Sequence, residues 1–119
     1  MKTHYVYILS NKIRTTLYIG ITNDLGRRIF EHKTGHVSAF CKKYNIIDLL
    51  YYEEYPSIVD AISREKQLKN WHKEWKWNLI KANNKHLNDI SKDWFTKEDY
   101  ENINVCKKMD RLEKYYRGS

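Results

Sequence analysis

The stretch from Tyr5 to Lys33 contains two short apolar runs, both rich in tyrosine, joined by a polar connection. Residues 4–10 alternate and are rich in aromatic and β-branched side chains, which predicts a strand. Residues 17–21 predict a second strand, antiparallel to the first if the connection is a hairpin. Because side chains alternate across a strand, we expect the odd and even positions of the first strand to lie on opposite faces.

Tyr18 and Gly20 would share a face of the second strand. A glycine inside a strand costs stability, so it often marks close approach by a ligand or by another backbone. A simple β-bulge at Gly20 is an equally good interpretation. The pattern alone leaves both open.

A basic helix is predicted directly after the second strand, with N-cap candidates at 22–24 and an end near Lys33 before Gly35. Leu25 and Ile29 are spaced to face the core. Arg28 and His32 are also four residues apart, so they would share a neighbouring face that can border the sheet, whereas Arg27 would point elsewhere.

The rest of the chain predicts one more strand and mainly helices. Residues 48–55 form the third strand, ended by Pro56, and residues 36–45 are a loop or a short helix. A helix from Ile58 to about Lys69 would begin with a capping box, Ser57 and Asp60. Over residues 71–82 we expect that this helix continues or restarts. Residues 88–95 should be irregular and pinned to the core by Trp94 and Phe95. A capping box at Thr96 and Asp99 would precede amphipathic helices over 97–116. The apolar stripes expected on the two middle helices are Ile58, Ala61, Ile62, Leu68 and Trp71 or His72, and then Trp75, Leu79 and Ala82.

Glu65 falls inside the first of these stripes. A carboxylate that faces inward must be paired, protonated or bound to a metal. Alternatively, Glu65 lies at the edge of the stripe and bonds to Arg64, Lys69 or a tyrosine hydroxyl. The pattern favours this second, purely structural interpretation.

Charge and composition restrict the class of protein. The 119 residues fit one domain, and 22 Lys and Arg against 15 Asp and Glu predict a polyanionic partner, with nucleic acid ahead of an anionic membrane surface. Cys41 and Cys106 form no metal-binding or redox spacing, which indicates free thiols in a reducing, cytoplasmic environment and no structural zinc. No apolar run reaches the roughly 18 residues of a membrane span.

These residue types suit phosphodiester hydrolysis, which needs an activated water, charge stabilisation on the phosphate and usually a divalent metal. Arg28 can contact a phosphate with its planar fork. Glu65 can hold a Mg²⁺ ion that keeps most of its waters. Each residue has a simpler alternative: the tyrosines as core rings, Arg28 as a solvated charge, and His32 as a satisfied edge residue.

The ordered motifs resemble the signature of the GIY-YIG nuclease superfamily, in particular its small single-domain bacterial branch. Tyr5-Val6-Tyr7 corresponds to the first half with the key tyrosine kept, and Tyr18-Ile19-Gly20 is the intact second half. Residues 22–32 resemble the following helix, with Arg28 and His32 at its functional positions. Residues 61–69 resemble the helix that supplies the metal-binding glutamate, here Glu65. Leu79-Ile80 and Asn84 resemble the closing segment, although Lys85 replaces its proline.

The resemblance implies an α+β fold, a small three-stranded antiparallel sheet flanked by helices, over residues 1–90. Residues 91–119 would be a C-terminal helical extension packed on the same domain. The implied activity is metal-dependent DNA cleavage with one Mg²⁺ or Mn²⁺ ion, in DNA repair or in processing of unusual DNA structures. Its implied residues are Tyr7 as base or water activator, Tyr18 and His32 as hydrogen-bonding partners, Arg28 on the phosphate, Glu65 on the metal, and Asn84. A non-catalytic nucleic-acid-binding module with the same fold is the alternative, and a homodimer is open.

Overall fold

The centre of the molecule is an antiparallel sheet of three strands in the order β2-β1-β3. The computed structural model describes residues 3–101. Its strands are β1 (His4–Ser10), β2 (Leu17–Thr22) and β3 (Asp48–Tyr55). The strands match the predicted ones closely, and the α+β fold class is confirmed.

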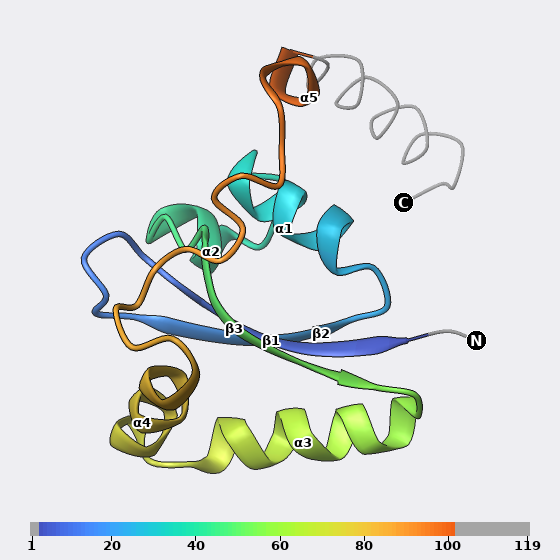
Figure 1. Cartoon of the computed structure of the whole chain (residues 1–119), viewed down its shortest axis with the longest axis vertical. Helices are drawn as coiled ribbons and strands as arrows, with labels where there is room; N and C mark the ends of the chain where they lie inside the picture. The colour runs from blue at the N-terminus through green and yellow to red at the C-terminus, as the bar shows by residue number, and fades with distance from the viewer. Residues whose placement is uncertain (1–2, 102–119) are drawn as a thin grey trace.

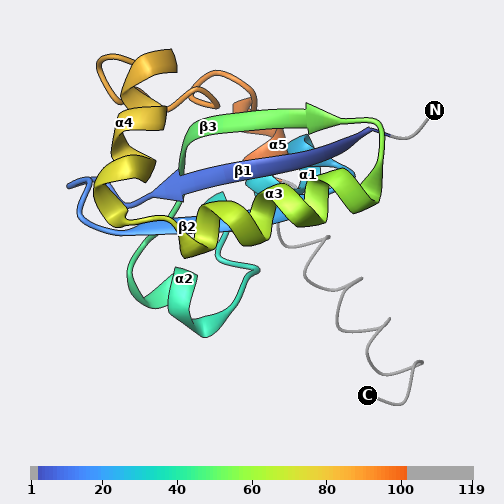
Figure 2. The same cartoon turned by 90° about the horizontal axis from the view of Figure 1, so that it is seen from below.

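Helices cover both faces of this sheet (Figure 1). On one side lie α1 (Leu25–Lys33) and α2 (Ala39–Lys43), and on the other α3 (Ile58–Asn70) and α4 (Lys73–Asn83). The view from below shows α3 running across the sheet with β1 between the two outer strands (Figure 2). The short α5 (Lys97–Glu101) lies beyond α1, and its Tyr100 ring is 5.7 Å from that of Phe30.

The strands therefore supply two separate hydrophobic clusters. The cluster on the α3 side is aliphatic: Val6, Ile8, Ile19, Leu50, Ala61, Leu68 and Ile80. The cluster on the α1 side contains Tyr7, Leu9, Leu25, Ile29, Cys41, Ile46 and Leu49. The alternation expected along β1 is confirmed, because its odd and even side chains enter different clusters.

Local signals also set most helix ends. Asp24 caps α1 by accepting a hydrogen bond from the Arg27 amide, and Gly35 adopts φ 80° just after the helix. Thr96 and Asp99 form the predicted reciprocal capping bonds, at 2.7 and 3.2 Å. Ser57 precedes α3 as predicted, but its side chain makes no capping bond.

The predicted apolar stripes on α3 and α4 are partly wrong. Ile58 and Ile62 remain 46% and 39% exposed, because α3 contacts the sheet through the narrower pair Ala61 and Leu68. Trp75, 52% exposed, and Ala82 also face outward, while Ile80 is buried.

A break in the backbone separates α4 from α3. Trp71 is extended, with φ −68° and ψ 151°, so the helix restarts, which is one of the two alternatives that the sequence left open. Of the stripe expected on α4, Leu79 packs against the α3-side cluster, and the neighbouring Ile80 is the buried residue that the stripe missed.

The C-terminal region is described only in part. Phe95 packs against the α1-side cluster, and its ring lies 5.1 Å from that of Phe30, as predicted for a residue that pins this segment. Cys106 and the predicted helical residues after 101 lie outside the described residues. The division at residue 90 and the homodimer stay predictions. Within residues 3–101, no helix combines the length and apolar character needed to cross a bilayer.

Candidate active site

Three predicted site residues meet on the α1 side of the sheet. Tyr7 comes from β1, Tyr18 from β2 and His32 from α1. The ring centroids lie 6.4 Å apart for the two tyrosines, 6.0 Å for Tyr7 and His32, and 5.5 Å for Tyr18 and His32. Hairpin and helix therefore bring the three rings into one cluster, which we call the ring cluster.

Gly20 makes room for this cluster. It is the cross-strand partner of Tyr7, and a Cβ at position 20 would overlap the hydroxyl oxygen and ring carbon Cζ of Tyr7. The β1–β2 register runs without a shift, so Gly20 is not a bulge. The close approach predicted at this glycine is real, but the approaching group is the Tyr7 phenol rather than a ligand or backbone.

Arg28 lies at the edge of the ring cluster. Its Nε donates a hydrogen bond to the Tyr7 hydroxyl at 3.3 Å, and its Nη1 is 3.1 Å from a Glu31 carboxylate oxygen. Its side chain is 37% exposed, against 76% for Arg27, which pairs with the same Glu31 at 3.2 Å. Arg28 is thus the arginine held against the tyrosine, as the spacing predicted.

A surface cavity of about 320 Å³ opens beside these arginines. It is lined by residues 21–24 at the end of β2, together with Arg27, Arg28 and Glu31. Glu31 neutralises part of the positive charge. The remaining guanidinium N–H groups are suited to a phosphate, which accepts paired hydrogen bonds from an arginine.

Burial sets the protonation of the ring cluster. Desolvation raises the pKa of Tyr7 to about 12, although the Arg28 hydrogen bond opposes this shift. Burial and the nearby Arg28 charge lower the pKa of His32 to about 4, and the Tyr7 contact raises the pKa of Arg28. At neutral pH the site therefore holds a neutral phenol, a neutral imidazole and a guanidinium cation. The phenol in this state can donate a hydrogen bond, and the role of Tyr7 as base or water activator stays a prediction.

His32 carries unused hydrogen-bonding capacity. The side chain is 1% exposed, and neither ring nitrogen makes a regular hydrogen bond within the described residues, although the backbone of Ile46 comes near. Most buried polar atoms have a partner, so an orphaned imidazole beside two tyrosines is unusual for a purely structural position.

Glu65 lies apart from the ring cluster. It belongs to α3, whose buried residues Ala61 and Leu68 pack on the face of the sheet opposite to Tyr7 (Figure 1). Its side chain is 16% exposed and its carboxylate is 3.1 Å from the Lys69 ammonium. The structure thus matches the edge position and the Lys69 pairing that the sequence left open for Glu65.

A divalent metal fits these residues only as a weakly held ion. No group of three or more His, Cys, Asp or Glu side chains converges anywhere in residues 3–101. Mg²⁺ does not need such a group, because it keeps several waters and is commonly held by one or two carboxylates plus substrate phosphates. Glu65 is partly exposed, and Lys69 is its only ionic partner within residues 3–101, so it fits that mode.

Asn84 holds the end of α4. Its side-chain amide donates to the Leu50 carbonyl at 3.1 Å and to the Asn88 carbonyl at 2.7 Å, and it accepts from the Asn88 amide at 3.1 Å. These bonds tie the helix end to β3. The structure brings Asn84 into contact with none of the other predicted site residues.

A polar network on the α3 side was missed by the sequence reasoning. Arg64 makes two bonds to Glu53, at 2.9 and 3.0 Å, and Glu53 also accepts from the Tyr51 and Tyr55 hydroxyls. These contacts lower the pKa of Glu53. The alternation Tyr51, Glu53, Tyr55 on one strand face was the available signal, but its partner comes from another element. The saturated bonding indicates a structural role.

Comparison with known proteins shows which family the chain belongs to. The family model for the GIY-YIG catalytic domain matches residues 3–79, which include every predicted site residue except Asn84. The chain belongs to the GIY-YIG family. A UPF0213 protein of Staphylococcus saprophyticus is 31% identical over 80 residues, covering 67% of this chain and 96% of the relative. Another, from Haloquadratum walsbyi, is 33% identical over 76 residues, covering 64% of this chain and 84% of the relative.

A solved structure is also similar. The solution NMR structure of a UPF0213 protein from Bacillus halodurans is 28% identical, covers 79% of this chain and 99% of its own, and has a TM-score of 0.49. Membership of the GIY-YIG family places the chain in a family of nucleases.

Proposed function

We propose that this protein is a metal-dependent endonuclease that hydrolyses phosphodiester bonds in DNA. The observation that carries the proposal is the convergence of Tyr7, Tyr18 and His32 with Arg28, which contacts Tyr7 and opens onto a surface cavity. Nothing in a simple core requires a guanidinium and an unpaired buried imidazole at one place. A phosphate with an attacking water uses both kinds of group.

Each residue has a role that follows from its surroundings. Arg28 binds the scissile phosphate through N–H groups not used by Tyr7 or Glu31. The neutral Tyr7 hydroxyl orients Arg28 and donates to a phosphate oxygen or the attacking water, while Tyr18 and neutral His32 hold that water in place. Asn84 contributes by fixing the end of α4.

A divalent ion held by Glu65 would supply charge stabilisation at the phosphate. Engaging it requires that Glu65 release Lys69 and reach past the edge of the sheet toward the phosphate. This follows because α3 and the ring cluster lie on different faces. The ion would come with the substrate and its waters rather than reside in a preformed cage.

The position of Glu65 favours a second function, a non-catalytic DNA-binding module, because Glu65 is paired with Lys69 and its helix lies on the other face of the sheet from the ring cluster. Burial also raises the pKa of Tyr7 to about 12, which keeps the phenol protonated. The two functions are distinguished by whether DNA is cleaved. Salt-sensitive binding without cleavage across all substrates and metals would support the binding module.

The deciding experiment measures cleavage of branched, nicked, flapped and single-stranded DNA with Mg²⁺ or Mn²⁺. Arg28→Ala is expected to lower the rate by about 10²- to 10³-fold, the cost of removing one preorganised donor to the developing charge. Arg27→Ala is the matched control on the same helix, since Arg27 shares Glu31 but does not contact Tyr7. It should lose far less.

Glu65→Ala tests the metal. Activity should disappear in this variant and in excess chelator, while the thermal unfolding midpoint stays near that of the parent. Cleavage that survives both treatments would exclude the role of Glu65. Equal losses for Arg27→Ala and Arg28→Ala would exclude the specific phosphate contact.

A further inference from the structure

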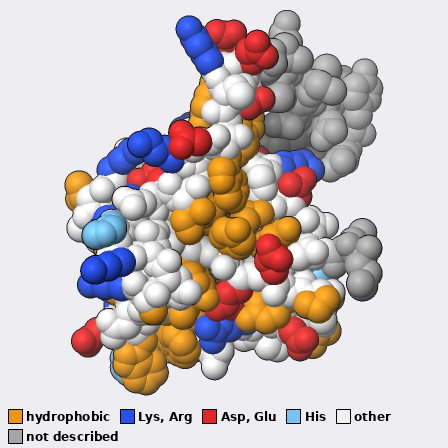
Figure 3. Space-filling view, in the orientation of Figure 1, with side chains coloured by type: hydrophobic (Ala, Val, Ile, Leu, Met, Phe, Trp, Pro, Cys, Tyr) orange, Lys and Arg blue, Asp and Glu red, His pale blue; other side chains and the backbone are white. Residues whose placement is uncertain are grey.

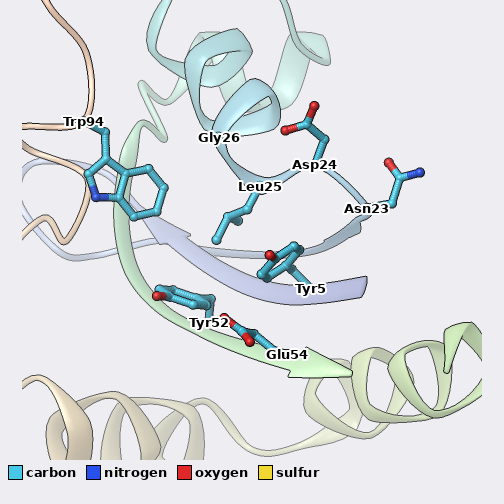
Figure 4. A pocket seen from close by; sticks show the side chains of 8 residues that line it. All are labelled: Tyr5, Asn23, Asp24, Leu25, Gly26, Tyr52, Glu54 and Trp94. Carbon is cyan, nitrogen blue, oxygen red and sulfur yellow. The ribbon is translucent and has the colours of Figure 1, made fainter. Parts of the chain in front are cut away.

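A second cavity, of about 310 Å³, opens near the start of α1 (Figure 4). The two cavities share Asn23 and Asp24 at the loop before α1. The second is lined by a different kind of side chain, aromatic and acidic: Tyr5, Asn23, Asp24, Leu25, Gly26, Tyr52, Glu54 and Trp94. We call it the aromatic cavity.

Three rings from distant parts of the chain surround this space. Tyr5 and Tyr52 come from β1 and β3 on the α1 side of the sheet, and Trp94 comes from the irregular segment before α5 (Figure 4). Their centroids are 6.2 Å apart for Tyr5 and Tyr52 and 6.4 Å for Tyr52 and Trp94, in edge-on rather than stacked pairs. Trp94 is 38% exposed. The exposed part of the Trp94 ring is the surface that a flat ligand can contact.

The charged groups of the aromatic cavity are hydrogen-bond acceptors. Glu54, the cross-strand partner of Tyr5, is exposed and forms no ion pair or hydrogen bond within the described residues. One oxygen of Asp24 already caps α1. Two carboxylates repel a phosphate, so the fitting ligand is an aromatic group that carries N–H donors. Figure 3 shows hydrophobic side chains gathered in the middle of this side of the molecule, with acidic and basic ones beside them.

The neighbouring arginines narrow the choice of ligand. An aromatic cavity with carboxylates could also hold a methylated ammonium group. However, Arg27 and Arg28 line the adjoining cavity and would repel a cation while attracting an anion attached to the same ligand. A nucleotide joins an aromatic donor to an anion, and its base and phosphate match the two cavities.

We propose that the aromatic cavity binds one unpaired nucleobase that bears an exocyclic amino group, while the adjacent phosphate lies at Arg28. This inference rests on the proposed function and specifies its substrate: DNA with a single-stranded or flapped segment next to the cleaved bond. Stacking on Trp94 and the tyrosines tolerates any base. Acceptance by Glu54 of an amino group favours cytosine, adenine or guanine over thymine.

The experiment compares binding to duplex DNA that carries a short single-stranded overhang, measured by fluorescence anisotropy in EDTA so that no cleavage occurs. One overhang is oligo(dC), and the other has the same phosphates but abasic sugars. Trp94→Ala should weaken binding to the first about tenfold, the usual effect of removing one stacking residue, and leave the second unchanged. Trp75→Ala is the matched control, an exposed tryptophan on α4 across the sheet.

Trp94→Phe separates stacking from folding, because it keeps an aromatic face and should retain most of the affinity. Glu54→Ala tests base choice. The parent should bind oligo(dC) overhangs about tenfold more tightly than oligo(dT) ones, and this preference should largely vanish in the variant. Because Glu54 is exposed, its replacement by alanine should leave the fold intact, and the thermal unfolding midpoint checks this.

Two results would overturn the proposal: Trp94→Ala that acts equally on the base-bearing and abasic overhangs, or a trimethyl-lysine peptide that binds the cavity more tightly than the oligonucleotide. The same series separates this failure from failure of the nuclease. If Trp94→Ala has no effect while Arg28→Ala abolishes cleavage, the aromatic cavity is excluded and the proposed function stands. If Arg28→Ala cleaves normally, the proposed function fails first.

Discussion

Neighbouring residues of β1 send their side chains into two chemically different layers. Val6 and Ile8 enter an aliphatic cluster under α3, whereas Tyr7 enters the α1 side, beside a histidine and an arginine. The charged pair on the α3 side, Glu53 and Arg64, is saturated with bonds. On the α1 side neither ring nitrogen of His32 makes a regular hydrogen bond within the part of the chain that the structure describes. The contrast agrees with the proposed function, in which the phosphate contacts lie on the α1 side and the α3 side stabilises the fold and adds the proposed metal ligand Glu65.

The largest expected effect comes from testing this division at adjacent positions of β1. Ile8→Ala should lower the free energy of unfolding by about 2–5 kcal/mol, since it leaves a cavity in a fully buried cluster. Tyr7→Phe removes only the hydroxyl that Arg28 contacts and should cost about 1 kcal/mol. Urea denaturation measures both.

The loss of cleavage activity should follow the opposite order from the loss of stability, and be larger for Tyr7→Phe than for Ile8→Ala. Under conditions where each variant is folded, Ile8→Ala should cleave DNA at nearly the parental rate, while Tyr7→Phe should lose about 10²-fold or more through its lost hydrogen bond at the phosphate. If the two variants lose activity in proportion to their lost stability, the functional division between the faces is wrong.

The ring cluster was predictable because its members are close in sequence. A hairpin and the helix after it fix the relative positions of Tyr7, Tyr18, Arg28 and His32, so strand alternation and helical spacing suffice. Gly20 was flagged by its position alone, although the group that approaches it could not be named. Local rules therefore place most of the candidate site.

Other features needed tertiary information. The sequence placed Glu65 on a helix, but only packing decides which face of the sheet that helix covers. The stripe expected on α4 was partly wrong: Leu79 packs against the core, but Trp75 is exposed and Ile80 is the buried residue, because the packing of α4 on the sheet decides which of its faces is covered. Trp94 reaches the aromatic cavity from an irregular segment, and no periodicity predicts where such a segment runs.

The second-largest expected effect on the free energy of unfolding concerns His32 and the pH dependence of stability. Its pKa is about 4 in the folded protein and close to 6.5 when unfolded, since burial and Arg28 oppose the charged form. The unfolded chain therefore binds a proton first as the pH falls. The stability is fully present above about pH 6.5, and on the order of 3 kcal/mol of it is lost between pH 6.5 and 4.

His32→Gln should remove most of this loss, because a neutral amide does not titrate. Urea denaturation of both proteins between pH 7.5 and 4 is the measurement. Ion pairs and hydrogen bonds lower the pKa values of Asp89 and Glu53 in the folded protein, so their protonation in acid destabilises both proteins equally. The difference between the two stability curves therefore reports the contribution of His32. Parallel curves would mean that His32 is hydrated and already free to protonate.

A substitution at Gly20 should destabilise the protein less than Ile8→Ala or protonation of His32, and it tests how tightly the α1 side is packed. A Cβ at this position would overlap the Tyr7 ring, so Gly20→Ala should cost about 2 kcal/mol as the phenol shifts. Gly26 in α1 is the matched control, because a Cβ there meets nothing within 4 Å. Gly26→Ala should stabilise the protein by about 0.5–1 kcal/mol through helix propensity.

A double variant shows whether the cost at position 20 arises from Tyr7 itself. Tyr7→Leu shortens the side chain and removes the ring atoms that the new methyl group would meet. Gly20→Ala should then cost less in the Tyr7→Leu background than in the parent, a coupling that urea denaturation of the four proteins measures. Equal costs in both backgrounds would mean that the strain lies in the β2 backbone. The phenol would then have room to move, and the ring cluster would be less rigidly held than the aliphatic cluster across the sheet.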